Sequence, residues 1–251
     1  MKRSARDPKA LRRQGLVLLA LLLVGAALAG CSSSRGLSRK GRADNAFARG
    51  DYASAIQDYQ VFLEEAGLGV EAMDAHFMLA RSYFENGDYP TAAVEFEIFQ
   101  RDYPRSDSLL AAAWYQTLCW VEQSPAYDRD ATPTLKAIQM LQDFLLDHPD
   151  APQAPDAKVK LAALQDKLAH KALSVAELYR RMERPQAAAI YYEKLLREYP
   201  DSPRADAAVL GLIAVRVEMG ERGEARRLAE RVAADRPDSE LARRARALLD
   251  R

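Results

Sequence analysis

The two cysteines are the residues of this sequence whose reactivity most depends on their surroundings. Cys31 stands in "LAGCSSS", residues 28–34, and Cys119 lies far along the chain in "YQTLCW". Two cysteines do not make a disulfide framework, and no Cys-x-x-Cys pair or Cys/His cluster indicates a metal site. We expect Cys119 to be an unpaired thiol that packs as a small core residue. The role of Cys31 depends on the segment before it.

The first thirty residues have the pattern of an export signal. Six basic side chains precede the apolar run against one acid, Asp7, and residues 16–29 are uncharged and apolar. At about 1.5 Å per residue the run is about 21 Å long as a helix, which is short of the roughly 20 residues that a membrane span needs. A core helix is the alternative, but such a helix would have a polar face. Residues 1–30 are therefore predicted to be a cleaved signal peptide.

Leu28-Ala29-Gly30-Cys31 resembles the lipobox, the cleavage site of bacterial lipoprotein signal peptides. The resemblance implies that the Cys31 thiol accepts a diacylglyceryl group and that cleavage leaves Cys31 as the first residue. It also implies a further acyl chain, such as palmitate, on the new amine, and more than one chain gives stable anchoring. Ser32, rather than aspartate, resembles the pattern sorted to the outer membrane of Gram-negative cells. The alternative is an ordinary export signal with an accidental cysteine.

Other residues that could do chemistry are isolated. His76, His148 and His170 stand outside any His-Glu-x-x-His pattern, and Glu95 and Glu97 point to different faces of a helix. No glycine-rich phosphate loop and no Gly-x-Ser-x-Gly occurs. The 36 basic and 36 acidic residues balance, which argues against nucleic acid as a partner. The sequence therefore predicts a protein that is not an enzyme and uses no cofactor or metal.

Small residues and prolines recur at fixed distances after the signal. Ala92, Ala137, Ala188 and Ala225 are each followed twelve positions later by a proline. Ala55 has Gly67 at that distance instead. Alanine permits two helices to approach closely, and proline ends a helix and restricts the residue before it. Helix formers dominate throughout, and no alternating β-branched run is present.

These features predict an all-α fold, a right-handed α-solenoid of about five tetratricopeptide-like helical hairpins. Residues 31–41 are expected to be a flexible tether, and 42–251 the solenoid. The third repeat carries the long loop "EQSPAYDRDATPT", and a helix of almost twice normal length is expected over about 156–182. The predicted repeats are about 42–67, 71–104, 106–149, 153–200 and 203–237, with a closing helix at 239–251.

Two surfaces are candidates for binding. Of the 20 aromatic residues, 15 lie between Phe47 and Tyr127. Some must fill repeat cores, but spare aromatics on a concave surface would suit an extended peptide. The candidates for this peptide site are Tyr52, Tyr59, Tyr83, Phe84 and Tyr115. The arginine-rich C-terminal half suits a folded partner, with Arg216, Arg226 and Arg227 as docking candidates. The alternative for these arginines is a solvated helix face with ion pairs.

The whole pattern resembles the BamD family, the lipoprotein subunits of the outer-membrane β-barrel assembly machine. The similarity rests on the lipobox, "GDYASAIQDYQVFLEEA", "ARSYFENGDYPTAAVEFEIFQRDYP", "YDRDATPTLKAIQMLQDFLLDHPDA" and "LAHKALSVAELYRRMERPQAAAIYYEKLLREYPDS". Two turns depart from the family pattern, at Glu183-Arg184-Pro185 and at Gly67.

The resemblance implies a scaffold that is anchored by lipid to the periplasmic face of the outer membrane. The C-terminal repeats would dock on the barrel insertase, alongside accessory lipoproteins, and the N-terminal repeats would receive unfolded outer-membrane protein precursors. The alternative is a periplasmic tetratricopeptide lipoprotein that coordinates cell-envelope or peptidoglycan synthesis. Such proteins often begin with a coiled coil, whereas no sustained heptad run is expected here. A hydrolase carried on a helical domain lacks a candidate nucleophile.

Overall fold

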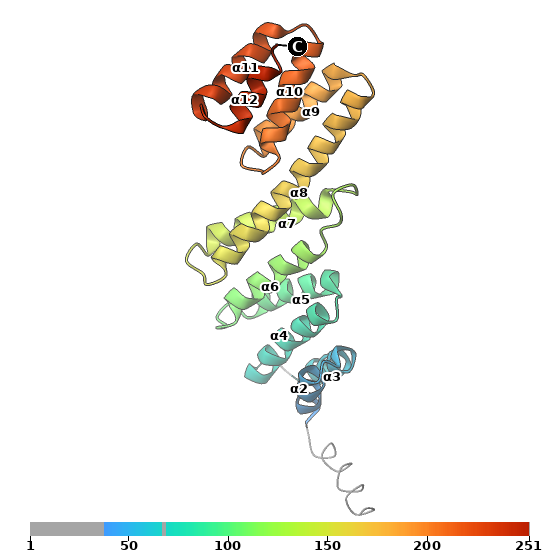
Figure 1. The fold of residues 1–251 in the computed structure, drawn as a ribbon. Helices are drawn as coiled ribbons and strands as arrows, with labels where there is room; N and C mark the ends of the chain where they lie inside the picture. The colour runs from blue at the N-terminus through green and yellow to red at the C-terminus, as the bar shows by residue number, and fades with distance from the viewer. Residues whose placement is uncertain (1–37, 67–68, 251) are drawn as a thin grey trace, which may run out of the picture. The chain divides into compact units, whose positions relative to one another are not determined.

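The computed structural model describes residues 38–66 and 69–250, and every regular element in them is an α-helix (Figure 1). The all-α class is therefore confirmed. The chain divides into two compact units, one ending at Asp88 and one beginning at Tyr89. The predicted signal peptide, Cys31 and tether residues 32–37 lie outside the described residues. Among the described helices, none combines the length and the apolar character that a membrane crossing requires.

The first unit contains α2 (Arg39–Ala48), α3 (Tyr52–Glu65) and α4 (Val70–Glu85), and α3 packs against both of the others. Helix α2 begins inside the segment predicted as tether, because the Ser38 side chain caps it by accepting a hydrogen bond from the Gly41 amide at 3.1 Å. Gly50 supplies the left-handed turn before α3, with φ of 76°. Asp51 then caps α3 through the Ser54 amide at 3.2 Å.

In the second unit each helix packs against the next one along the chain, as expected for stacked helical hairpins. The elements are α5 (Tyr89–Asp102), α6 (Leu109–Glu122), α7 (Thr132–Asp147), α8 (Ala154–Arg181), α9 (Pro185–Glu198), α10 (Ala205–Glu218), α11 (Arg222–Asp235) and α12 (Glu240–Ala247). The last helix also contacts α10, so it closes the hydrophobic cluster at this end.

The recurring alanines are completely buried, which confirms their predicted role as points of close helix approach. All five have no exposed surface, namely Ala55, Ala92, Ala137, Ala188 and Ala225. The four prolines stand two positions beyond the ends of α5, α7, α9 and α11. Helix termination by proline is thus confirmed at each of these sites.

Helix α8 differs from the other helices in its length of 28 residues, which is about 42 Å at 1.5 Å per residue. Its first part packs on α7, where Ala157 and Leu164 join the cluster of Leu141 and Phe144. Its last part packs on α9, where Ala176 contacts the buried cluster around Tyr192. Figure 1 shows α7 beside the beginning of α8 and α9 beside its end.

The long loop between α6 and α7 is fixed to α8. The Tyr127 ring stacks on His170 with centroids 3.9 Å apart. The Lys167 ammonium donates to the Ser124 hydroxyl at 2.8 Å, and the neighbouring Lys171 donates to a loop carbonyl at 2.6 Å. The loop is therefore held by three side chains on one face of a rigid helix.

Candidate functional site

Two of the predicted aromatic residues of the first unit lie half-buried at its surface. The Tyr52 ring packs edge-to-face against Phe47 at 5.3 Å between centroids, and the Arg81 guanidinium lies over the same Phe47 ring at 5.2 Å. The Tyr83 hydroxyl accepts a hydrogen bond from the Gln60 amide at 2.8 Å. These contacts orient both tyrosines while leaving part of each ring exposed.

Tyr59 is a correction to the predicted peptide site. Its side chain is fully buried, and its hydroxyl donates to Asp44 at 2.6 Å. Lys40 bridges Asp44 at 3.1 Å and Asp74 at 2.6 Å, so the hydroxyl ends in a charged network. Burial, followed by the hydrogen bond to Asp44, raises the pKa of Tyr59 above its ordinary value. Tyr59 is thus a core residue with no surface to offer a peptide.

The remaining aromatic candidates divide between the two units. Phe84 is half-buried near the end of α4, in the first unit with Tyr52 and Tyr83. Tyr115 belongs to α6 of the second unit, where its ring stacks on Phe96 with centroids 5.5 Å apart and planes 13° from parallel. We call the three predicted residues that are half-buried in the first unit, Tyr52, Tyr83 and Phe84, its aromatic surface, and Tyr115 is described separately.

Arg216 is engaged by its own unit. From α10 its guanidinium donates to Glu193 on α9 and to Glu221 just before α11. Burial lowers the pKa of Arg216, but the hydrogen bonds and charges of Glu193 and Glu221 outweigh it and the pKa is raised. The half-buried side chain thus joins three successive helical segments. This position gives Arg216 an internal structural contact in addition to any partner.

Arg226 and Arg227 are exposed on α11, as a docking surface requires. Arg227 pairs with Glu224 one turn earlier. Arg226 lines a cavity of about 460 Å³ between α11 and the segment around α12, together with Arg246 and Leu249. The two arginines are therefore the accessible members of the predicted docking set.

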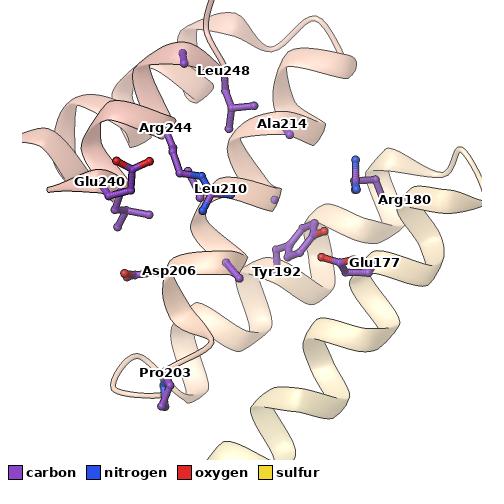
Figure 2. A pocket seen from close by; sticks show the side chains of 14 residues that line it. Glu177, Arg180, Tyr192, Pro203, Asp206, Leu210, Ala214, Glu240, Arg244 and Leu248 are labelled. Atoms are coloured by element: carbon purple, nitrogen blue, oxygen red, sulfur yellow. The ribbon is translucent and has the colours of Figure 1, made fainter.

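A larger groove was not predicted from the sequence. It has a volume of about 670 Å³ and lies between α8, α10 and α12, with Tyr192 of α9 at its floor (Figure 2). Gly211 leaves room for that ring, because a Cβ atom built at this position would lie only 2.3 Å from the Tyr192 Cζ atom. The available signal was a glycine inside the strongly helical run "ADAAVLGLIAV", which indicates close packing against a neighbour.

Several acids around this groove are already paired. Asp206 accepts from Arg236 at 2.7 Å, and Glu240 accepts from Arg243 at 3.0 Å. Among the described residues, no ion pair engages the remaining charged groups of the lining, which are Glu177, Arg180 and Arg244. Once the paired acids Asp206 and Glu240 are set aside, Arg180 and Arg244 stand against Glu177 alone, which leaves an excess of positive charge among the groups without ion pairs.

The floor of the groove carries a polar atom without a hydrogen bond. The Tyr192 hydroxyl is buried and makes none within the described part of the chain. Burial raises the pKa of Tyr192; Glu177 adds to the rise and Arg180, close by but outside hydrogen-bond geometry, opposes it. In Figure 2 Glu177 and Arg180 lie beside the ring at the end of α8.

Metal chemistry has no visible basis in residues 38–66 and 69–250. No group of three or more His, Cys, Asp or Glu side chains there is arranged to hold an ion. Cys119 is buried and free, and burial raises its pKa to about 12, so the thiolate is strongly disfavoured.

Comparison with known proteins adds relatives at modest identity. The chain is 26% identical over 208 residues to the outer membrane protein assembly factor BamD of Vibrio cholerae, covering 76% of this chain and 84% of that protein. It is 21% identical over 225 residues to the protein of the same name from Caulobacter vibrioides, covering 84% and 73%.

A solved structure, the complex of the TPR2AB domain of yeast Sti1 with pHSP90, is also similar. It is 15% identical, with a TM-score of 0.42 over 84% of this chain and 81% of that chain. A model of the YfiO family, described as outer membrane lipoprotein, matches residues 41–231. Because this match spans most of the sequence, the chain belongs to the YfiO family of outer membrane lipoproteins.

Proposed function

We propose that this protein is a non-enzymatic lipoprotein scaffold that promotes the assembly and insertion of β-barrel proteins into the outer membrane. The observation that carries the proposal is the family match over residues 41–231. Relatives that cover most of the chain are named outer membrane protein assembly factors. Stacked helical hairpins present extended surfaces of the kind that scaffolds use.

We place the protein at the periplasmic face of the outer membrane, held by acyl chains on Cys31. The support is the sequence pattern "LAGC" at the end of an apolar signal-like run. Two or more acyl chains would give anchoring that a single chain does not. The family's description as outer membrane lipoproteins agrees with this placement.

We propose that the first unit receives unfolded outer-membrane protein precursors through Tyr52, Tyr83 and Phe84. Half-buried aromatic rings offer large contact areas at a small cost in side-chain entropy. The contacts of Tyr52 with Phe47 and of Tyr83 with Gln60 hold these rings in place before a peptide arrives. Tyr115, in the second unit, would extend the same kind of recognition.

The second unit would dock on the barrel insertase and on accessory lipoproteins. Arg226 and Arg227 are exposed, and the groove above Tyr192 has two arginines without ion pairs among the described residues. Positive charge at a rim favours acidic partner surfaces and raises association rates. We propose no catalytic step, because the buried Cys119 is poorly suited as a nucleophile.

The proposal is tested by affinity purification from detergent-solubilised membranes. The wild-type protein is expected to bring down a large barrel protein with periplasmic repeats. The double variant Arg226→Glu, Arg227→Glu should recover at least about tenfold less of it, since like charges across an interface are strongly unfavourable. Recovery of cell-wall synthesis enzymes alone would support instead the alternative role in envelope or peptidoglycan synthesis.

A second arm separates precursor binding from docking. Replacing Tyr52 and Tyr83 by alanine should reduce crosslinking to an unfolded barrel precursor while the insertase is still recovered. Both residues are half-buried at the surface, so the fold should survive, and circular dichroism checks this. If precursor crosslinking is unchanged, the first unit's aromatic surface is not the receiving site.

A further inference from the structure

Helix α8 carries an apolar stripe that is longer than the helix packed against it. Side chains along one face follow each other at alternating steps of four and three residues, and they are Ala157, Leu161, Leu164, Leu168, Lys171, Val175, Leu178 and Met182. This spacing is the seam that packs against another helix in coiled coils. The run is interrupted by Lys171 and lies within the second unit, so the expectation that the chain lacks an N-terminal coiled coil stays a prediction.

The beginning of this seam is already covered. Ala157 and Leu164 are buried in the cluster formed with Leu141 and Phe144 of α7, and Leu161 packs against it. Helix α7 runs alongside α8 only as far as its own first residues, where Ala131 and Leu135 line the same cavity as Leu168. Beyond that point the seam continues for about three more turns without α7.

The last residues of the seam are exposed, whereas Leu168 is buried and Lys171 and Val175 are half-buried. The side chains of Leu178 and Met182 retain 47% and 53% of their surface, although both are large and apolar. A different face of α8, around Ala172 and Ala176, makes the contact with α9. The groove of Glu177 and Arg180 in Figure 2 opens on a third side. Leu178 and Met182 therefore lie outside both of these contacts, whereas Lys171, earlier in the stripe, is bonded to the loop carbonyl of Arg129.

A cavity marks the place where α7 stops. It has a volume of about 410 Å³ and lies between the start of α7, the middle of α8 and the flank of α9. Its wall is largely apolar, from Leu135, Leu168, Val175 and Tyr191. The Lys194 ammonium pairs with Glu198, the acid of the lining, at 3.9 Å. Among the described residues this leaves two cations without an ion pair, Lys171, whose ammonium donates to the Arg129 carbonyl, and Arg181, which is exposed one turn beyond.

We infer that the uncovered part of this seam, from Val175 to Met182, together with the apolar cavity beside it, is a docking groove for an amphipathic helix with acidic flanks, supplied by a partner protein. The helix would lie on α8 as a continuation of α7 and insert apolar side chains between Val175, Leu178 and Tyr191. Helix-in-groove binding takes apolar anchors at three- and four-residue steps, which is the spacing that the seam offers. The basic rim selects acidic flanks. This inference does not depend on the proposed role in barrel assembly.

The occupant's chemistry can be tested with a probe that the chain itself provides. A fluorescein-labelled peptide copying Thr132–Asp147, the α7 helix, carries the apolar face that already packs on the same seam. It should bind the full-length protein saturably in fluorescence anisotropy. A peptide with Asp143 and Asp147 replaced by lysine should bind several-fold more weakly, because the rim is basic.

Variants of the seam decide where the peptide binds. Leu178→Glu should weaken binding at least about tenfold, as loss of a central apolar anchor does. Val159→Glu is the matched control, since Val159 is on the same helix, is 67% exposed and lies off the seam. Both positions are exposed, so both variants should keep the wild-type thermal unfolding. A wild-type protein that shows no saturable binding, or Leu178→Glu binding as wild type does, overturns the inference.

Two other occupants are distinguished by the same variant. If sedimentation shows a dimer that Leu178→Glu dissociates, the seam is covered by a second copy of this chain and the partner helix is excluded. If the unlipidated protein binds vesicles containing anionic phosphatidylglycerol and Leu178→Glu abolishes this, the seam contacts a lipid surface and the inference fails.

Discussion

At the scale of single residues, the packing of the second unit depends on a glycine at position 211, where any larger side chain would collide with a buried ring. Gly211 lies in the interior of α10, where glycine weakens a helix. The position is occupied by the ring of Tyr192, which is fully buried against it. The cost in helix propensity is therefore offset by close packing of α9 on α10.

We predict that Gly211→Ala destabilises the protein. The added Cβ would lie 2.3 Å from Tyr192 Cζ, so a buried ring must move. Overpacking of this kind costs about 1–3 kcal/mol and should outweigh the gain of about 1 kcal/mol in helix propensity. The matched control is Gly223→Ala in α11, where no atom lies within 4 Å of the new methyl group. Urea unfolding should show loss in the first variant and no loss in the second; equal stability of both would contradict the close approach.

The Tyr59 network makes the first unit sensitive to alkaline pH. The pKa of Tyr59 is raised, first by burial and then by Asp44, and the pKa of Lys40 is raised because Asp74 and Asp44 outweigh its burial. Both groups keep their protons in the folded state at a pH where the unfolded chain loses them. The contribution of Tyr59 and Lys40 to the free energy of unfolding is therefore fully present below a pH of about 10, and it is lost as the pH rises above that value.

Tyr59→Phe tests this network. At pH 8 the variant should be about 1–3 kcal/mol less stable, because the hydrogen bond from the hydroxyl to a carboxylate is lost. The difference from wild type should shrink between pH 10 and 11, since phenylalanine has no proton to lose. Thermal unfolding across this pH range measures it, and a constant difference would mean that Tyr59 does not titrate with folding.

At the scale of elements, the repeated prolines predict from the sequence where α5, α7, α9 and α11 end, and the repeated alanines predict buried positions within these helices. Ala92 and Ala225 are fully buried, and α5 and α11 end two residues before their prolines, because both constraints are local and steric. The boundary at Ser38 was missed by a few residues, since its side-chain cap starts α2 within a polar segment.

The binding surfaces were less predictable because they depend on contacts between distant residues. Tyr59 and Tyr83 look alike in the sequence, yet one is buried on Asp44 and the other lies half-buried at the surface. Arg216 is distinguished from Arg226 by its ion pairs with Glu193 on another helix and with Glu221 before α11. The groove above Tyr192 forms only where α8, α10 and α12 pack together, so the sequence of any one of these helices does not predict it. Residue type predicted the kind of chemistry, whereas tertiary packing decided which side chains remain available.

The alanine positions give an element-scale prediction. Ala188 is fully buried in the cluster that joins α8, α9 and α10. Ala188→Trp should lower stability by at least about 3 kcal/mol, since a large ring cannot fit between closely packed helices. Ala163→Trp, at an exposed position on α8, should stay within about 0.5 kcal/mol of wild type. Calorimetric melting compares the two, and an unchanged melting temperature for Ala188→Trp would show that the repeat alanines are not the points of close approach.

At the scale of the whole molecule, two kinds of attachment are proposed, and they have different physical characters. Acyl chains on Cys31 would hold the protein by burial of hydrocarbon, at about 0.8 kcal/mol per methylene. Docking through Arg226, Arg227 and the groove of Arg180 and Arg244 would be largely polar and therefore weakened by salt. High salt should thus release the second attachment and leave the first intact.

Cys31→Ala separates the two attachments in cells. The variant is expected to be exported and then to leave the membrane fraction when membranes are washed with high salt, whereas wild type should remain and incorporate labelled palmitate. Cys119→Ala is the matched control, because this thiol is buried and free in α6 and should have no part in anchoring. Retention of Cys31→Ala after the salt wash would mean that hydrocarbon on residue 31 is not what holds the protein. Release before the wash would show that docking alone is too weak to keep the second unit on its partner, so the acyl chains supply the local concentration at which docking occurs.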